Sequence, residues 1–115
     1  MSGVAIRRRG LVYNHGILAG TLDERADRSF VFTYHQTYLA RPKPSPISLT
    51  LPCRSKPYIS DHLFPFFYGL LSEGGTRTLQ SRLLRIDEED HFGLLLATAA
   101  DTIGSVTITP QEDPS

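Results

Sequence analysis

The chain has 115 residues, of which 40% are hydrophobic and 21% charged, and surface scaling lets a domain of this size bury about two-thirds of its unfolded surface. These proportions are those of one globular domain, and they exclude a second independent domain, a coiled coil and a disordered chain. The net charge is zero, but residues 1–58 carry nine Lys and Arg against three Asp and Glu, and residues 59–115 carry three against nine. We expect these halves to compensate each other within the fold rather than to form a nucleic-acid-binding face.

Cysteine usage and hydropathy indicate the cellular compartment. Cys53 is the only cysteine and cannot form an internal disulfide, which fits a reducing environment. Neither an N-terminal apolar segment of the secretory type nor an apolar run long enough to cross a membrane occurs. We therefore expect a soluble, cytoplasmic protein with no membrane partner.

Strand patterns dominate the first part of the chain. The apolar runs at residues 4–13 and 17–22 flank Asn-His-Gly at residues 14–16, and Asn and Gly tolerate the positive φ angles of a tight turn. The sequence SFVFTY at residues 29–34 consists of residues that favour a pleated surface. An antiparallel hairpin followed by a third strand is the prediction.

A connector and a further strand pattern follow. Residues 35–40 are compatible with one helical turn, and three prolines within residues 42–46 remove backbone donors and favour an extended path. Residues 47–51 then alternate with period two and stop at Pro52. This pattern predicts a short fourth strand.

Helical spacing begins at Ser60, and three helices are predicted. The first is capped by Ser60 or Asp61 and ends at Gly74-Gly75, and the third begins at Asp87 with acidic residues in its first turn. Their apolar positions are Phe64, Phe67, Leu70 and Leu71 in the first, Leu79, Leu83 and Ile86 in the second, and Phe92, Leu95, Leu96 and Ala99 in the third.

A last strand is predicted at residues 105–109, before a polar tail. The order of elements indicates an α+β fold, a mainly antiparallel sheet with three helices packed on one side. We assign residues 4–110 to this domain and residues 111–115 to the tail.

Signatures of common enzymes are missing from the sequence. It contains no phosphate-binding glycine loop, no H-E-x-x-H zinc motif and no G-x-S-x-G nucleophile motif. The four histidines lie apart, at predicted turns, strand ends or helix starts, and Cys53 has no partner that would make it a nucleophile. We therefore predict no catalytic residue, no cofactor and no metal ligand.

Two charged runs have structural explanations. The arginines of residues 7–9 would point to alternating faces of a strand, where solvated edge residues discourage aggregation. The acidic residues 87–90 suit the start of a helix better than a metal site.

The segment of residues 62–75 is the strongest candidate for a binding site. It holds four aromatic residues within residues 64–68, more than one face of one helix buries in so small a domain, and an acidic, glycine-rich stretch follows. Aromatic anchors beside flexible charged residues are typical of protein–protein contacts. Burial in the core is the competing interpretation.

The same segment carries a family resemblance. PISLTLP at residues 46–52, FFYGLLSEG at 66–74, DHFGLL at 90–95 and GSVTITP at 104–110 together resemble the N-terminal subdomain of HipA-type toxin kinases. Ser72 stands where many relatives have Pro, and Gly75 where many have a bulky residue such as Trp.

The resemblance implies a role beside a kinase. In that family the subdomain precedes an ATP-binding kinase core, and the catalytic-loop and D-F-G motifs of such a core do not occur here. The chain is instead similar to the stand-alone HipS proteins of tripartite HipBST toxin–antitoxin systems. By this resemblance the partners are a truncated HipA-like (HipT-type) kinase, which the protein binds and neutralises, and a HipB-like DNA-binding protein.

The expected partner-binding residues are those of the aromatic segment and the stretch after it: Phe64, Phe67, Tyr68, Glu73, Gly74, Gly75 and Arg77. The initial Met and the polar tail lead us to expect a complete small protein. Two other interpretations stay open, an accessory subunit that the kinase complex needs for assembly or activity, and an independent small enzyme or nucleic-acid binder.

Overall fold

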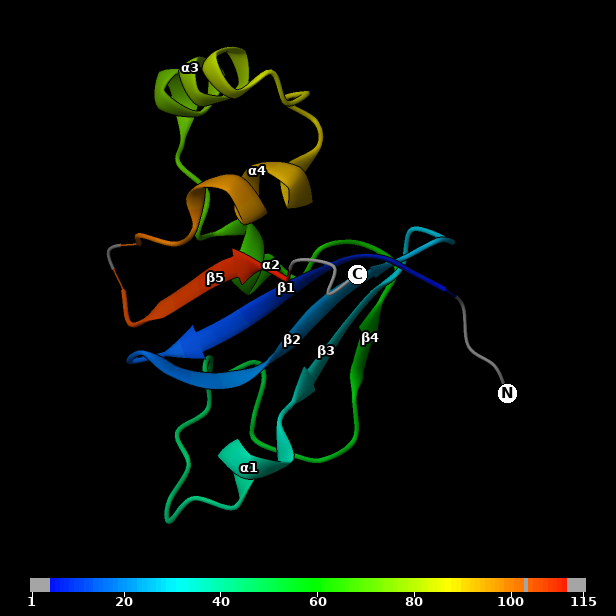
Figure 1. Cartoon of the computed structure of the whole chain (residues 1–115), viewed down its shortest axis with the longest axis vertical. Coiled ribbons are helices and arrows are strands. Elements are labelled where there is room, and N and C mark those ends of the chain that lie inside the picture. Colours follow the sequence, from blue (N-terminus) through cyan, green and yellow to red (C-terminus); the bar gives the residue numbers. More distant parts are fainter. Residues whose placement is uncertain (1–4, 103, 112–115) are drawn as a thin grey trace.

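A computed structural model describes residues 5–102 and 104–111 of the chain. It has an α+β fold built on one sheet of five strands in the order β4-β3-β2-β1-β5, with every neighbouring pair antiparallel (Figure 1). The strands are β1 (Ile6–Asn14), β2 (Ile17–Arg25), β3 (Phe30–Tyr34), β4 (Tyr58–Ser60) and β5 (Val106–Pro110). The helices are α1 (Gln36–Leu39), α2 (Pro65–Tyr68), α3 (Gly74–Leu84) and α4 (His91–Thr98).

Three predicted strand features are confirmed. The β1–β2 hairpin turns at His15 and Gly16, whose φ angles are 51° and 78°, as a two-residue hairpin turn with both central φ angles positive requires. The SFVFTY segment forms β3, and the last predicted strand forms β5.

One face of the sheet carries the core. The register pairs Leu22 with Phe32 and Val12 with Ile108, so these four buried side chains share a face. α4 and α2 supply the opposing side chains, which include Phe67, Phe92 and Leu95. Tight packing of apolar groups on this face supplies most of the driving force for folding.

The predicted fourth strand is wrong. Residues 47–51 form a turn closed by a single bridge between Ser48 and Leu51, and Leu49 is 94% exposed. The flanking prolines remove the donors that a ladder needs, while Ile47 and Leu51 are fixed by the buried Tyr34 hydroxyl, which accepts from the Ile47 amide and donates to the Leu51 carbonyl. The fourth strand is β4, which the sequence did not predict.

The first predicted helix is also shorter than expected. α2 is one turn with Pro65 at its first position, and Phe64, not Ser60 or Asp61, occupies the N-cap. Gly74 and Gly75, expected to end that helix, are the first two residues of α3. Gly74 has a φ of 58°, which a glycine adopts without strain.

The helices number four in the described residues, and they do not all cover one side of the sheet. α1 packs at the end of β2, away from the other helices, and α3 stands off the body of the domain (Figure 1). α4 begins at His91 rather than at Asp87, and its N-cap is Asp90, whose carboxylate accepts from the Gly93 amide. No helix in the described residues is long and apolar enough to cross a membrane.

Candidate partner-binding site

Tyr68 joins three helices at the surface. Its hydroxyl accepts a hydrogen bond from Arg77 Nη1 of α3 at 3.1 Å, and the Arg77 guanidinium lies 5.3 Å from the centre of its ring. The ring of His91, the first residue of α4, meets it edge to face at 5.0 Å. Tyr68 is 41% exposed, so it links α2, α3 and α4 while keeping surface available for a partner.

The other predicted partner-binding residues divide into two groups. Phe67 is fully buried against Phe32 and presents no surface, and Phe64 is half-buried against the core. Glu73, Gly74 and Gly75 are exposed at the start of α3. The structure therefore brings the later residues of the set together beside Tyr68 and places the two phenylalanines in the core.

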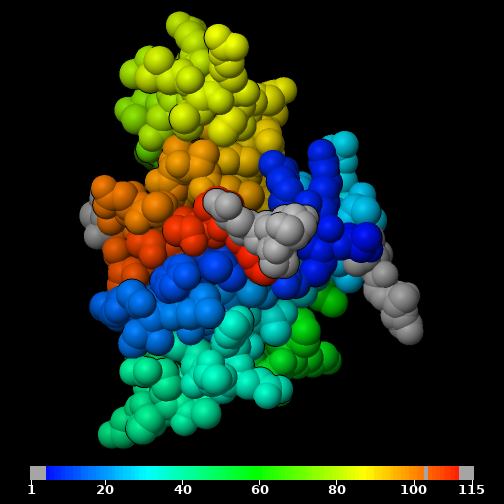
Figure 2. Space-filling model, in the orientation of Figure 1, coloured from blue at the N-terminus to red at the C-terminus, as the bar shows by residue number. Residues whose placement is uncertain are grey.

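α3 also carries a set of exposed leucines that the sequence analysis missed. Leu79, Leu83 and Leu84 of α3 are 54%, 72% and 46% exposed, and α3 has no buried residue. In Figure 2 the corresponding yellow-green and yellow residues form a lobe that protrudes from the body of the domain. The helical spacing of these leucines predicted the helix but not the direction its apolar side faces.

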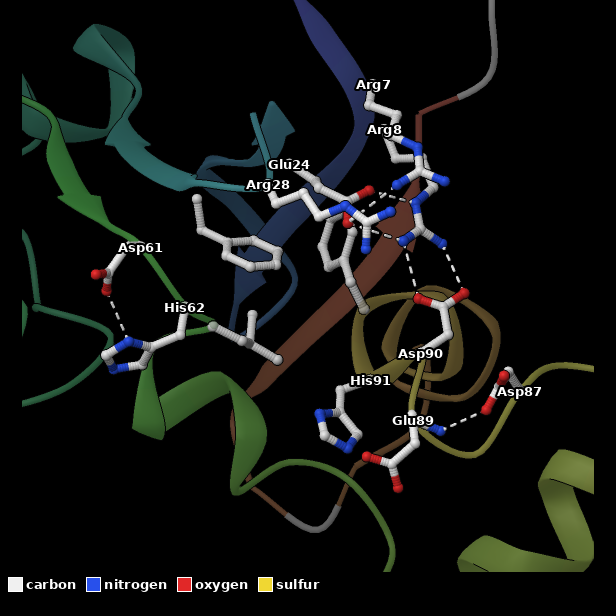
Figure 3. Close-up of a pocket in the computed structure, with 13 residues that line it drawn as sticks. Arg7, Arg8, Glu24, Arg28, Asp61, His62, Asp87, Glu89, Asp90 and His91 are labelled. Carbon is white, nitrogen blue, oxygen red and sulfur yellow. Dashed lines mark hydrogen bonds and ion pairs between the residues drawn. The ribbon is translucent and has the colours of Figure 1, made fainter. Parts of the chain in front are cut away.

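Arg8 ties the start of α4 to the sheet. A bulge at Arg7 shifts the β1–β2 register so that Arg8 lies opposite Glu24. Arg8 Nε and Nη2 donate to the Glu24 carboxylate at 2.6 and 3.0 Å, and Arg8 Nη1 and Nη2 donate to that of Asp90 at 3.0 and 2.9 Å (Figure 3). Two bidentate pairs thus converge on one guanidinium, the geometry that favours Arg over Lys.

These contacts correct the interpretation of the arginine run. β5 pairs with β1 only from Gly10 onward, so the described strands leave that side of Arg7 and Arg8 unpaired, as expected of an edge, but the side chain of Arg8 is engaged in ion pairs rather than fully solvated. Arg9 pairs with Asp23 on the opposite face, with Arg9 Nε 2.6 Å from Asp23 Oδ1. Of the Arg–carboxylate pairs in the described residues, Arg8–Asp90 alone joins the two oppositely charged halves of the chain. Arg7 and Arg28 of the basic half also line one pocket with Asp61, Asp87 and Glu89 of the acidic half, so charges of opposite sign from the two halves lie near each other there.

The ion pairs change the acidity of their members. Hydrogen bonds from Arg8 hold the pKa of the Asp90 carboxyl below its ordinary value, and those to Asp90 and Glu24 raise the pKa of Arg8. Burial raises the pKa of the Cys53 thiol, and a thiol that is protonated at neutral pH is a poor nucleophile.

A pocket of about 540 Å³ lies beneath the Arg8 contacts. Phe30, Leu63 and Phe92 provide its apolar lining, and charged groups and His62 and His91 surround them (Figure 3). His91 belongs both to this pocket and to the Tyr68 contact, so the pocket adjoins the candidate partner-binding site. The described residues contain no group of three or more His, Cys, Asp or Glu side chains that could hold a metal ion.

Comparison with known proteins identifies the family of this fold. The family model for the HipA N-terminal domain matches residues 10–109. The chain belongs to the HipA N-terminal domain family. The structure is similar to the solved structure of the N-terminal domain of HipA toxin, with a TM-score of 0.71 and 31% sequence identity. The match covers 98% of this chain and 99% of that one.

Two relatives of this HipA N-terminal domain differ in length. An uncharacterized protein of Haemophilus influenzae is 35% identical over 105 residues, which are 91% of this chain and 94% of that protein. The protein named "Putative kinase Y4mE" of Sinorhizobium fredii is 27% identical over 101 residues, which are 88% of this chain but only 24% of that protein. The domain is therefore found both nearly alone and as about a quarter of a longer chain.

Proposed function

We propose that this protein is an antitoxin-type partner that binds and neutralises a HipA-like serine/threonine kinase lacking this domain. One observation carries the proposal: the same domain makes up nearly all of one relative and about a quarter of another that is named a kinase. A domain separated from its chain keeps the surface that packed against the rest, and such surfaces can reassociate.

The exposed surface around α3 supports this role. Monomeric small domains rarely expose several large apolar side chains close together. Burying such side chains against a partner lowers the free energy of the complex. Tyr68 and Arg77, at the base of α3, are residue types enriched among the dominant contacts of interfaces. Binding beside the kinase active site would block substrate access or hold a mobile loop in an inactive arrangement. A HipB-like DNA-binding protein would complete the complex.

Co-expression tests the proposal directly. A HipA-like kinase that lacks this domain, which we expect to be encoded beside this gene, is expressed alone and together with this protein, and growth is followed. We expect the kinase alone to arrest growth and the pair to grow. No rescue and no complex on co-purification would refute the proposal.

The same experiment distinguishes the antitoxin role from the accessory-subunit alternative. If the kinase needs this protein for assembly or activity, then the kinase alone is harmless and toxicity appears only when both are present.

We also expect the purified protein to show no phosphotransferase activity with Mg²⁺ and ATP, because its sequence lacks the phosphate-binding and catalytic-loop motifs of kinases. Turnover that a point substitution in this chain abolishes would contradict that expectation.

A further inference from the structure

α3 presents its apolar side to solvent instead of to the core. Leu79 and Leu83 are four residues apart and therefore lie one turn apart on the same side of the helix, and they are 54% and 72% exposed. Gly75 precedes Leu79 by one more turn, and a side chain there would meet nothing within 4 Å. Gly75, Leu79 and Leu83 therefore form an exposed stripe along the helix. It is apolar at the two leucines and has no side chain at Gly75.

The charges of α3 are all positive. Residues 74–86 contain Arg77, Arg82 and Arg85 and no Asp or Glu, and these are the three basic residues of the negatively charged half of the chain. Arg82 and Arg85 are exposed. Among the described residues, none of the three arginines forms an ion pair with a carboxylate. Arg82 adjoins the leucine stripe, since it follows Leu79 by three residues and precedes Leu83.

This charge pattern argues against a second copy of the chain as the occupant. In a symmetric dimer built on α3, the same patch meets itself, and residues 74–86 of one copy offer no carboxylate to the arginines of the other. Like charges brought together in an interface cost several kcal/mol. A partner that covers the leucines must instead carry negative charge around an apolar surface.

Few contacts anchor α3 to the rest of the domain. An isolated helix of 11 residues is marginally stable in water, and α3 buries no side chain that would stabilise it. Its anchors lie elsewhere: the hydrogen bond from Arg77 to Tyr68, one from Thr78 Oγ1 to Glu88 Oε2 at 2.9 Å, and Ile86, which packs against the core just after the helix. These contacts hold the first half of α3 and the residues just after it, and they leave the leucine stripe uncovered.

We propose that α3 docks as a basic amphipathic helix into an apolar groove that is rimmed by acidic side chains on the kinase. Leu79 and Leu83 enter the groove, and Arg82 and Arg85 pair with carboxylates on its rim. The absence of a side chain at Gly75 lets the groove wall approach the backbone. This inference rests on the proposed function and names the chemistry of the partner surface.

Binding measurements with matched variants test the inference. The purified protein and the purified kinase are titrated by calorimetry at about 0.05 M and about 0.5 M NaCl, between which screening of surface charges increases strongly. The test variants are Leu83→Asp and Arg82→Glu. Their controls are Leu49→Asp and Lys56→Glu, which make the same changes at exposed positions outside α3. Melting curves verify that all four variants fold.

We expect Leu83→Asp and Arg82→Glu each to weaken binding about tenfold or more, and the controls to change it less than about twofold. Added salt should weaken binding of the wild-type protein, and it should weaken binding of Arg82→Glu less.

The outcomes separate this inference from the proposed function. If the kinase binds and is neutralised while the α3 variants bind like the controls, the docking inference fails and the proposed function stands. If the kinase binds through α3 but is not inhibited, the neutralising role fails and the docking inference stands. If no complex forms with the wild-type protein, both fail. A wild-type dimer that Leu83→Asp dissociates in sedimentation would overturn the charge argument against a second copy.

Discussion

Leu95 and Leu83 are both leucines within helices, and their surroundings are opposite. Leu95 of α4 is fully buried in the core, whereas Leu83 of α3 is 72% exposed. α4 is fixed by its apolar side chains and by a capping carboxylate that is itself paired with Arg8, while α3 has no buried side chain and is anchored by polar contacts of Arg77 and Thr78. Leucines therefore stabilise the fold in one helix and stay available for association in the other.

The largest expected effect tests this contrast directly. Leu95→Ala should lower the free energy of unfolding by about 2–5 kcal/mol, because it leaves a cavity in the core. Leu83→Ala should change it by less than about 0.5 kcal/mol, because the side chain is already in water. Urea unfolding monitored by circular dichroism measures both. Similar losses for the two variants would mean that α3 packs on the domain in solution.

The second prediction concerns Arg8, whose ion pair with Asp90 holds the start of α4, whereas no ion pair in the described residues holds α3. Arg8→Ala should cost about 2–3 kcal/mol, because it leaves the Glu24 carboxylate, whose side chain is 8% exposed, without its bidentate partner. Lys56→Ala is the control, an exposed cation outside the contacts described here, and should have almost no effect on stability. Equal effects of the two substitutions on urea unfolding would exclude a stabilising role for Arg8.

The pH dependence of stability isolates the Asp90 part of these contacts. The pKa of Asp90 is lowered in the folded protein, chiefly by hydrogen bonds from Arg8, and its ordinary value is about 3.9. The unfolded chain therefore binds the proton more readily, so this stabilisation is complete above about pH 5 and is lost as the pH falls through the folded pKa. Asp90→Asn should cost about 1 kcal/mol or less near neutral pH, because the carboxylate is about one-third exposed and partly screened.

Unfolding curves between about pH 3 and pH 8 provide the check on Asp90. The difference between wild type and Asp90→Asn should be constant at neutral pH and should shrink below about pH 4. Asp61→Asn, at a carboxylate whose side chain is 93% exposed, is the control and should follow the wild-type curve. A difference that persists unchanged to low pH would show that Asn at this position disturbs the helix cap rather than the ion pair.

The sequence predicted those parts of the fold that depend on neighbouring residues. The hairpin at residues 14–16 and the strands at residues 29–34 and 105–109 follow from turn chemistry and period-two patterns, and they are confirmed. Residues 47–51 show the limit of the same argument, because an alternating pattern becomes a strand only where a neighbouring strand has free donors and acceptors. That segment bonds to the Tyr34 hydroxyl instead.

The candidate site was harder to predict because it depends on contacts distant in the chain. Tyr68, Glu73, Gly75 and Arg77 were found from composition and resemblance, and the structure places them around the start of α3. The exposed leucine stripe was missed because periodicity gives the side of a helix that is apolar and not what faces it. The Arg8–Asp90 pair joins residues 82 positions apart, and no local pattern indicates such a contact.

The smallest expected effect concerns the stability of α3 itself. Because α3 buries no side chain, its amides should exchange with solvent by local opening. The free energy of that opening should be much lower than for the amides of β1 and β2, which we expect to open only with the whole domain. Gly75→Ala should then slow exchange within α3 about threefold to fivefold, since Ala is favoured over Gly in a helix by about 0.5–1 kcal/mol and the added methyl group meets nothing within 4 Å. Urea unfolding of the whole domain should be almost unchanged.

Gly74→Ala is the matched control, because a φ of 58° strains any residue with a Cβ, so this substitution should speed exchange instead. Hydrogen exchange followed by NMR measures both variants, and α3 amides as slow as those of β1 would show that the helix is an integral part of the core.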